Sequence, residues 1–284
     1  MEIRNLENID FDTLFRGFER AFADYQINFD KEEVRSMLKR RGYNPRLSFA
    51  AFDDEEIAAF TLNGIGTFGG IATAYDTGTG TVKEYRGRGL AGKIFEFSVP
   101  FLKEAGIRQY LLEVLQDNEK AISVYRKMKF EVTREFDCFR QSIRDIDVSP
   151  YPIDIQCCDI KPIDPVEACR LQSFCDFLPS WQNSTDSIER GKDGLTGLAA
   201  IAEGSPIGYC IFDPETGDLT RIAVREDFRR KGIGSRLLQE AAAGMNTDFI
   251  KVLNVSPDCH TLTEFLKKSN IPLVSRQFEM ILPL

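Results

Sequence analysis

Hydrophobic and polar residues alternate in a pattern that predicts two similar sets of strands. In the first half, residues 47–52 (LSFAAF) and 56–63 (EIAAFTLN) are apolar runs separated by acidic residues. In the second half, residues 195–203 (LTGLAAIAE) and 206–213 (PIGYCIFD) form a comparable pair. Short apolar runs rich in β-branched and aromatic residues and bounded by turn residues are typical of strands. The pattern therefore predicts a strand pair in each half.

The same order of elements continues after each strand pair. Apolar residues at helical spacing after a strand predict a helix, and a further apolar run predicts the next strand. A second helix and a final strand are expected to complete each half, and residues 11–24 and 30–41 are expected to be helical. In the first half, the expected central elements are a strand at 69–76, a helix that begins at Leu90 and a strand at 109–116. In the second half, they are a strand at 218–224, a helix that begins at Ile233 and a strand at 248–255.

An arginine–glycine motif recurs between the central strand and the helix. Arg86-x-x-Gly89-x-Ala91 in the first half matches Arg229-x-x-Gly232-x-Gly234 in the second, and the two copies lie half the length of the chain apart. A repeat of this length indicates a tandem duplication of a domain. Acidic residues and prolines near the midpoint of the chain indicate a boundary between domains. We therefore predict one domain over 1–145 and a second over 146–284.

The motif has the residue types of an anion site. The first amides of a helix have no intrahelical acceptor, and the helix N-terminus is partially positive. Glycines such as Gly87 and Gly89 let the backbone approach a bulky anion, and arginines add forked donors. The sequence contains no GxxxxGK[ST] loop. The motif predicts a pyrophosphate cradle, and the alternative is a pair of glycine turns that only begin helices.

Composition narrows the classes of function. The net charge of −8 and the pI of about 5.0 argue against broad binding to nucleic acid. The sequence lacks a signal peptide and any apolar run long enough to span a membrane, so we expect a cytoplasmic protein without membrane partners. Seven cysteines without CxxC spacing and a single histidine, His260, predict reduced thiols and no metal site.

On these motifs the chain resembles the GNAT superfamily of acyl-CoA-dependent N-acyltransferases. Residues 81–91 (TVKEYRGRGLA) and 223–234 (AVREDFRRKGIG) both match its [RQ]-x-x-G-x-[GA] motif. The resemblance implies an α+β fold in α/β/α layers, with two tandem domains that each have a mixed, mostly antiparallel twisted sheet flanked by helices. It also implies that the turn binds the pyrophosphate of acetyl-CoA and that strand amides hold the pantetheine arm. The cofactor residues it implies are Thr81, Val82, Arg86, Gly87, Arg88, Gly89, Leu90 and Ala91, and in the second half Val224, Arg229, Arg230, Lys231, Gly232, Ile233 and Gly234.

A second family feature lies in residues 114–131 (VLQDNEKAISVYRKMKFE). It resembles the N-x-x-A-x-x-x-Y segment of the family, in which Asn118 would face the pantetheine arm and Tyr125 would lie beside the thioester sulfur. A phenol stays protonated at neutral pH, so Tyr125 could protonate the leaving thiolate. The alternative is that Tyr125 is a half-buried core aromatic. In the second half Phe265 is expected at the position of Tyr125, and it cannot donate a proton.

The implied reaction is direct transfer of an acetyl group from acetyl-CoA to an amine, without a metal. Glu113 is the predicted proton acceptor, and Asp76 and Glu84 are weaker candidates. The expected acceptor is a small polar molecule or a peptide, and the protein is expected to be a monomer whose domains form a pseudo-dimer, or a homodimer. The best hypothesis is one active domain and one structural domain. The alternative is a non-catalytic sensor or scaffold that binds coenzyme A.

Overall fold

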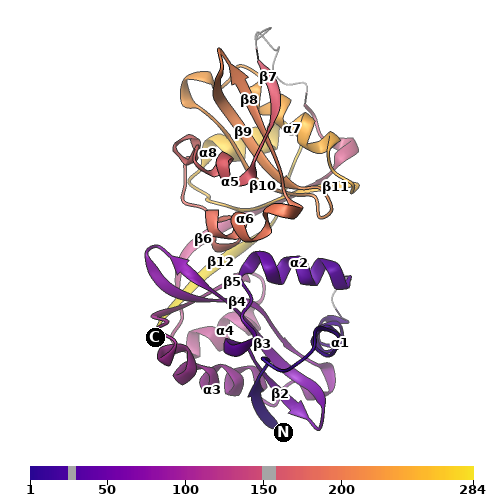
Figure 1. Ribbon diagram of the computed structural model, residues 1–284, viewed down its shortest axis with the longest axis vertical. Helices are drawn as coiled ribbons and strands as arrows, with labels where there is room; N and C mark the ends of the chain where they lie inside the picture. The colour runs from indigo at the N-terminus through magenta and orange to yellow at the C-terminus, as the bar shows by residue number, and fades with distance from the viewer. Residues whose placement is uncertain (25–29, 149–157) are drawn as a thin grey trace. The chain divides into compact units, whose positions relative to one another are not determined.

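The computed structural model describes residues 1–24, 30–148 and 158–284 (Figure 1). The chain divides into two compact units. The first unit contains residues 1–114, 118–133 and 279–284, and the second contains 115–117 and 134–278. Over the described ranges, no helix is both long enough and apolar enough to cross a bilayer.

The first unit is a sheet with helices on both faces. Its strands are ordered β1-β2-β3-β4-β5, and all pairs are antiparallel except the parallel pair β4–β5. Its elements are β1 (Glu2–Asn5), α1 (Phe11–Phe22), α2 (Lys31–Arg41), β2 (Phe49–Asp53), β3 (Glu56–Phe68), β4 (Ile71–Thr81), α3 (Leu90–Glu104), β5 (Gln109–Leu115) and α4 (Glu119–Lys127).

The second unit repeats this plan. Its strands are ordered β6-β11-β10-β9-β8-β7, and β10–β11 is parallel where the other described pairs are antiparallel. β6 and β12 contribute residues to both units. The elements are β6 (Glu131–Ser142), β7 (Asp159–Ile163), α5 (Pro165–Cys169), α6 (Thr185–Gly191), β8 (Thr196–Ala202), β9 (Ser205–Asp213), β10 (Asp218–Val224), α7 (Ile233–Ala243), β11 (Phe249–Val255), α8 (His260–Lys268) and β12 (Leu273–Pro283).

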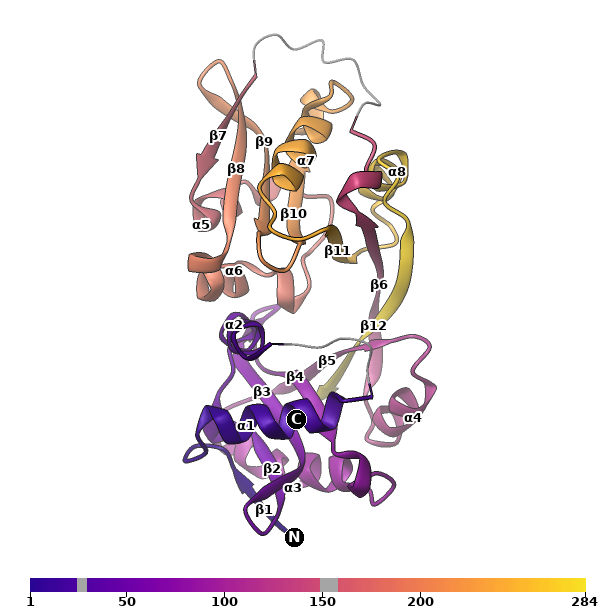
Figure 2. The same cartoon turned by 90° about the vertical axis from the view of Figure 1, so that its right-hand side faces the viewer.

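Alternating side chains build a core on each face of each sheet. In β2, Phe49 and Ala51 pack with α3, while Ala50 and Phe52 pack with α1 and α2. Figures 1 and 2 show α1 and α3 on opposite faces of these strands. β9 divides in the same way, because Cys210 and Phe212 pack with α7 and their neighbours pack with α5 and α6. The predicted mixed, mostly antiparallel sheet flanked by helices is confirmed in both units.

The central strand of the first unit is longer than the pattern predicted. The expected strand ended at residue 76, whereas β4 continues to Thr81 and pairs with β3 along its whole length. Gly78 and Gly80 lie within β4 and do not interrupt its pairing with β3. The register shifts by one residue at Thr77 and then resumes. This shift is a β-bulge, an irregularity at which glycine is common.

Candidate active site

The parallel strands β4 and β5 separate soon after they meet. In the described part of the first unit, their ladder ends at the pair Tyr75↔Leu111, although β4 continues to Thr81 and β5 to Leu115. The facing edges therefore carry main-chain groups that the sheet does not pair. β10 and β11 separate in the same way after Asp218↔Lys251. Asp218 is the counterpart of Tyr75, because the two are as far apart in the sequence as the two motifs are.

A bulge follows the point of separation in both units. Thr77 is the extra residue in β4, and its counterpart Thr220 is the extra residue in β10. In the first unit the Asp76 carboxylate supports the bulge, because it accepts hydrogen bonds from the Gly78 N–H (2.9 Å) and the Thr79 hydroxyl (2.8 Å). The two halves thus share an irregularity at the same position, as well as their motif.

Strand geometry decides which amides face the gap. Val82 N–H donates to the Ala58 carbonyl (2.9 Å), so this amide is used by β3. N–H groups alternate between the two edges of a strand, so the Thr81 amide faces the side from which β5 has diverged. In the second unit Arg225 N–H donates to the Ile207 carbonyl (2.9 Å), so the Val224 amide faces the corresponding gap. Of the two predicted amides in the first unit, Thr81 is the one that can reach a ligand.

The glycine turn of the first unit presents the N-terminus of α3. Gly87 (φ 79°) and Gly89 (φ 69°) are both left-handed, a conformation that favours glycine. The first helical hydrogen bond runs from Lys93 N–H to the Gly89 carbonyl, so the amides of Leu90, Ala91 and Gly92 have no intrahelical acceptor. A Cβ at Gly87 or Gly89 would meet no atom within 4 Å, so the space in front of the turn is open.

The second turn has the same geometry, although an arginine replaces its first glycine. Gly232 (φ 81°) begins α7, and the first helical bond runs from Arg236 N–H to its carbonyl (3.0 Å). Arg230 stands where Gly87 stands and is also left-handed (φ 64°). This conformation costs a residue that has a Cβ about 1 kcal/mol or more. The second unit therefore keeps the shape of the turn without its first glycine.

Each motif arginine is an anchor within the fold. Arg86 donates to the carbonyls of Thr81 (3.1 Å) and Ala21 (3.0 Å) and to the Asp24 carboxylate (2.7 Å). Arg229 makes the matching set, which ends on the carboxylate of Asp176 (2.8 Å). The Arg86 side chain holds the pKa of Asp24 below its usual range. Both arginines thus tie their turn to the preceding strand and helix region.

Exposed cations stand beside both turns. Arg88 donates to the Glu84 carbonyl (3.0 Å), and its guanidinium lies 5.1 Å from the centre of the Tyr85 ring. Lys231 donates to the Asp227 carbonyl (3.0 Å), and its ammonium lies 4.9 Å from the Phe228 ring centre. These long side chains remain at the surface, where they can add positive charge toward a bound phosphate.

Asn118 and Tyr125 lie at the start and near the end of α4. The Asn118 side chain caps the helix by accepting from Ala121 N–H (3.2 Å). Tyr125 is half-buried, and its ring packs against Phe130 at 5.7 Å between centres. Phe130 in turn lies 5.7 Å from Tyr110 on β5. The Tyr125 ring therefore belongs to an aromatic cluster that joins α4 to β5.

The predicted proton acceptors lie just beyond the point where β4 and β5 separate. Glu113 is half-buried on β5 and accepts from the Tyr75 hydroxyl (3.3 Å). Burial raises the pKa of Asp76 to about 6, against the hydrogen bonds from Thr79 and Gly78 that lower it. Glu84 is exposed in the short turn before Arg86. The structure thus places Glu113 and Asp76 on the two strands that border the gap and leaves Glu84 at the surface.

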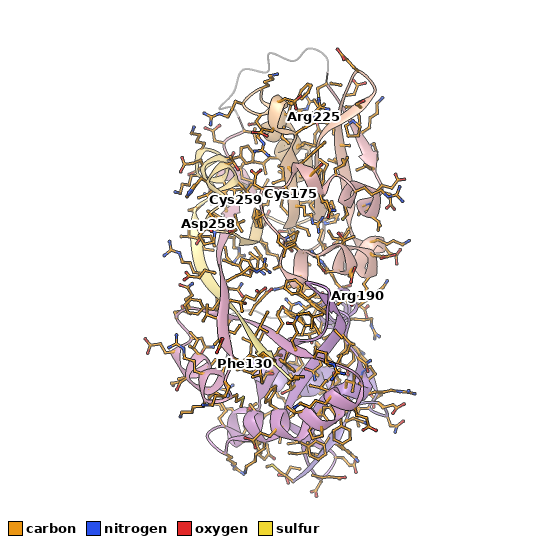
Figure 3. The ribbon with its side chains drawn as sticks, turned by 90° about the vertical axis from the view of Figure 1, so that its left-hand side faces the viewer. Phe130, Cys175, Arg190, Arg225, Asp258 and Cys259 are labelled. Carbon is orange, nitrogen blue, oxygen red and sulfur yellow. The ribbon has the colours of Figure 1, made fainter. Side chains whose placement is uncertain are left out.

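A cavity of about 480 Å³ occupies the gap of the second unit. It is lined by Val224, Arg229, Arg230, Gly232, Ile233 and Gly234 among the predicted cofactor residues, and Lys231 lies outside its lining. Figure 3 labels Cys175 and Cys259, which line it from the loop before α6 and from the N-terminus of α8. Arg221 also lines the cavity, and the sequence pattern gave no sign of it, because nothing local marks a strand arginine as buried.

The second unit offers no phenol at the position of Tyr125. The helix-end bond from Phe130 N–H to the Tyr125 carbonyl matches the bond from Ile271 N–H to the Leu266 carbonyl. Leu266 therefore takes the position of Tyr125, and Phe265, one residue earlier, lines the cavity. The expected alignment with Phe265 is off by one residue, but neither side chain can donate a proton. α8 contributes three titratable side chains to this cavity, those of Glu264, Lys268 and the exposed His260.

The described residues contain no cluster of three histidine, cysteine, aspartate or glutamate side chains that could hold a metal ion. Amides without intrahelical acceptors, an open glycine turn and an adjacent split in the sheet suit an elongated ligand with a phosphate group. The helix N-terminus, the turn and the split occur in both units.

Comparison with known proteins gives the same family for both halves. A sequence profile described as the acetyltransferase (GNAT) family matches residues 8–130, and a profile described as an acetyltransferase (GNAT) domain matches residues 194–268. Together they cover more than half of the chain.

One curated relative is N-alpha-acetyltransferase 30 of Schizosaccharomyces pombe, which is 34% identical over 87 residues. The match covers 30% of this chain and 58% of that protein, so the chain spans less than two thirds of its relative.

Solved structures share the fold along nearly the whole chain. A tandem GNAT protein from the clavulanic acid biosynthesis pathway has a TM-score of 0.74 at 11% identity, covering 99% of this chain and 98% of its own. A GCN5-related N-acetyltransferase from Sphaerobacter thermophilus has a TM-score of 0.71 at 13% identity, covering 99% and 95%. At these identities the likeness concerns the fold alone.

Proposed function

This chain belongs to the GNAT family of acetyltransferases, as two domains in tandem, and from that premise we propose that its first unit transfers an acetyl group from acetyl-CoA to an amine. The observation that carries the proposal is the combination of a split between β4 and β5 with the open amides of α3 and a phenol on α4. The second unit has the split and the turn, but no phenol at the matching position.

The first unit would hold the donor at two places. The amides of Leu90 and Ala91, helped by Arg88, would bind the pyrophosphate, and the Thr81 amide would bind the pantetheine arm. The open space before Gly87 and Gly89 supports this fit, because a bulky anion must approach the backbone there. Arg86 would act by holding the turn in shape. Asn118 would keep the start of α4 beside the donor through its cap.

The reaction would be a direct attack. The amine nitrogen bonds to the thioester carbon, and strand amides stabilise the negative charge that develops on its oxygen. The carbon–sulfur bond then breaks, and Tyr125 gives its proton to the leaving thiolate. Glu113 takes the proton that the amine loses, directly or through a water molecule. Asp76 is the competing acceptor, since its pKa of about 6 leaves it ionised at neutral pH.

The acceptor would be an amine on a small polar molecule or a peptide. The acidic chain favours cationic partners, because a negative field attracts them. The name of the Schizosaccharomyces pombe relative adds the α-amino group of a peptide as one candidate. Carboxylates at the gap of the first unit would receive such a cation.

Titration calorimetry with acetyl-CoA, followed by thiol release with a panel of amines, tests the proposal. The variants are Gly89→Glu and its matched partner Gly232→Glu. Gly89→Glu should abolish thiol release, because a charged side chain would fill the cradle of the first unit. Gly232→Glu should leave it largely intact. If only Gly232→Glu stops turnover, the active site lies in the second unit and the assignment is wrong.

A second candidate function is that of a non-catalytic sensor. The cavity of the second unit favours it, since it offers space for a ligand without a phenol at the position of Tyr125. Binding of acetyl-CoA without thiol release on any amine would support this candidate over transfer.

A further inference from the structure

A buried arginine lines the cavity of the second unit. Arg221 is only 7% exposed, and its place in β10 is directly after the bulge residue Thr220. Its Nε and Nη2 donate to one acceptor, the carbonyl of Asn183, at 2.9 and 2.7 Å. Its Nη1 has no hydrogen-bond partner. One edge of a buried guanidinium therefore remains unsatisfied beside an open cavity.

The surroundings do not neutralise this charge. Across the described residues, Arg221 forms no ion pair, and its further neighbours are the Thr185 hydroxyl (3.5 Å), the Tyr209 phenol and the Cys169 thiol. Burial raises the pKa of the phenol and of the thiol, so both stay neutral at pH 7. Asp218, the buried carboxylate on the same strand, accepts from Thr220 at 3.1 Å. A buried cation without a counter-ion is costly, and proteins normally pair it.

A second polar atom at this cavity is also unsatisfied. The Ser235 hydroxyl lies in the first turn of α7, its residue is 4% exposed, and it has no hydrogen-bond partner. Ser235 and Arg221 line the same cavity from the helix and the strand. Two buried donors of this kind match the oxygen atoms of an anionic ligand.

The first unit differs at the matching position. Gly78 is the counterpart of Arg221 in the repeat, and a Cβ there would touch only the Phe18 ring at 3.8 Å. The neighbouring ionisable groups in the first unit include the carboxylates Asp76 and Glu113 and the guanidinium of Arg41, which donates to the Thr77 carbonyl (2.9 Å). The two gaps therefore share their turn geometry, but only the strand of the second unit carries an arginine at this position.

We propose that the cavity of the second unit binds a small molecule that carries a carboxylate, with Arg221 as its counter-ion. The carboxylate could end the acyl chain of a coenzyme A thioester, or it could belong to a separate amino-acid-like ligand. The proposal goes beyond acetyl transfer in the first unit, and it rests on the proposed function only in taking the second turn as the anchor for coenzyme A.

Calorimetry on the full chain tests the first source. Gly89→Glu is included throughout to silence the first turn, so the result does not depend on whether the first unit transfers acetyl groups. Succinyl-CoA and butyryl-CoA have the same chain length and differ in a carboxylate against a methyl group. Binding of succinyl-CoA at least about 10-fold tighter than butyryl-CoA is expected, a factor worth about 1.4 kcal/mol. Arg221→Met should remove the preference, and Arg225→Met, which alters a partly exposed arginine paired with Asp227, should keep it.

The second source is tested with coenzyme A and free carboxylates. If the carboxylate belongs to a separate ligand, the two thioesters bind alike, while glutamate or glutarate raises the unfolding temperature of the coenzyme A complex. Glutamine should raise the unfolding temperature less than glutamate does, and glutaramide should raise it less than glutarate does. Equal binding of both thioesters together with no stabilisation by free carboxylates overturns the proposal. These ligand pairs are compared on the chain with native Arg221, so the outcome stands even if Arg221→Met fails to fold.

Discussion

Arg86 and Asp24 form an ion pair with 2.7 Å between Nη1 and Oδ2, and it joins the glycine turn to the end of α1. Arg229 and Asp176 form the matching pair in the second unit at 2.8 Å. The shared geometry of the two copies within one chain indicates that the first residue of the motif sets the position of the turn. The anion would then be bound mainly by the backbone that the arginine holds.

This relationship predicts different effects for the two arginines of the first turn. Arg86→Ala removes bonds to two carbonyls, so it should cost about 1–2 kcal/mol of unfolding free energy and weaken acetyl-CoA binding at every salt concentration. Arg88→Ala should leave stability nearly unchanged and weaken binding most at low salt, because its charge is exposed and screened. Thermal unfolding measures the stability and calorimetry measures acetyl-CoA binding. Both are carried out at salt concentrations from about 50 to about 500 mM, over which the Debye length falls from about 14 to about 4 Å. A strongly salt-dependent loss for Arg86→Ala would contradict the anchor role.

Tyr125 provides a test of the chemistry. Tyr125→Phe keeps the ring that packs on Phe130 but removes the proton donor. We expect kcat to fall by about 10²-fold or more while the affinity for acetyl-CoA stays within about twofold. Tyr43→Phe, which removes a phenol that packs with α2 outside the gap, is the matched control and should not change kcat. Unaltered turnover of Tyr125→Phe at neutral and alkaline pH would exclude the acid role.

Asp76 predicts a pH dependence of stability. Its folded pKa of about 6 lies above the ordinary value of 3.8, so the folded chain holds this proton more tightly than the unfolded chain. Protonated Asp76 therefore contributes its full stabilisation of the folded chain below about pH 4. This contribution, up to about 3 kcal/mol of unfolding free energy, is lost as the pH rises through about 6. Asp76→Asn should remove that loss, so its stability relative to the native chain should increase from pH 4 to pH 6. Urea unfolding at intervals of pH measures the difference, and a constant difference would refute the shift.

Lys129 predicts a gain in stability. It follows the end of α4 with φ 73°, a left-handed conformation that favours glycine. Lys129→Gly should raise the free energy of unfolding by about 0.5–1 kcal/mol, because the left-handed strain disappears and the bond from its N–H to Arg126 is kept. Lys127→Gly, inside the helix, should instead lower it by about 1 kcal/mol. Equal effects of the two substitutions would show that the end of α4 carries no such strain.

The sequence by itself determined the elements and the two turns, because these depend on local patterns. The alternation in β2 and the helical spacing after Leu90 reflect which side chains face the core. Gly89 and Gly232 could be assigned to turns because glycine favours the left-handed conformation that both adopt.

Only the tertiary structure decided what those turns are attached to and what faces the gaps. The anchor of Arg229 comes from Phe174 and Asp176, which precede α6 and are distant from the turn along the chain. The burial of Arg221 results from packing against the segment that contains Asn183. Contacts between distant segments leave no periodic signal in the sequence, since they depend on how strands and loops meet in space. For that reason the motif predicted the cradle, whereas the charge inside the second cavity had to be found in the fold.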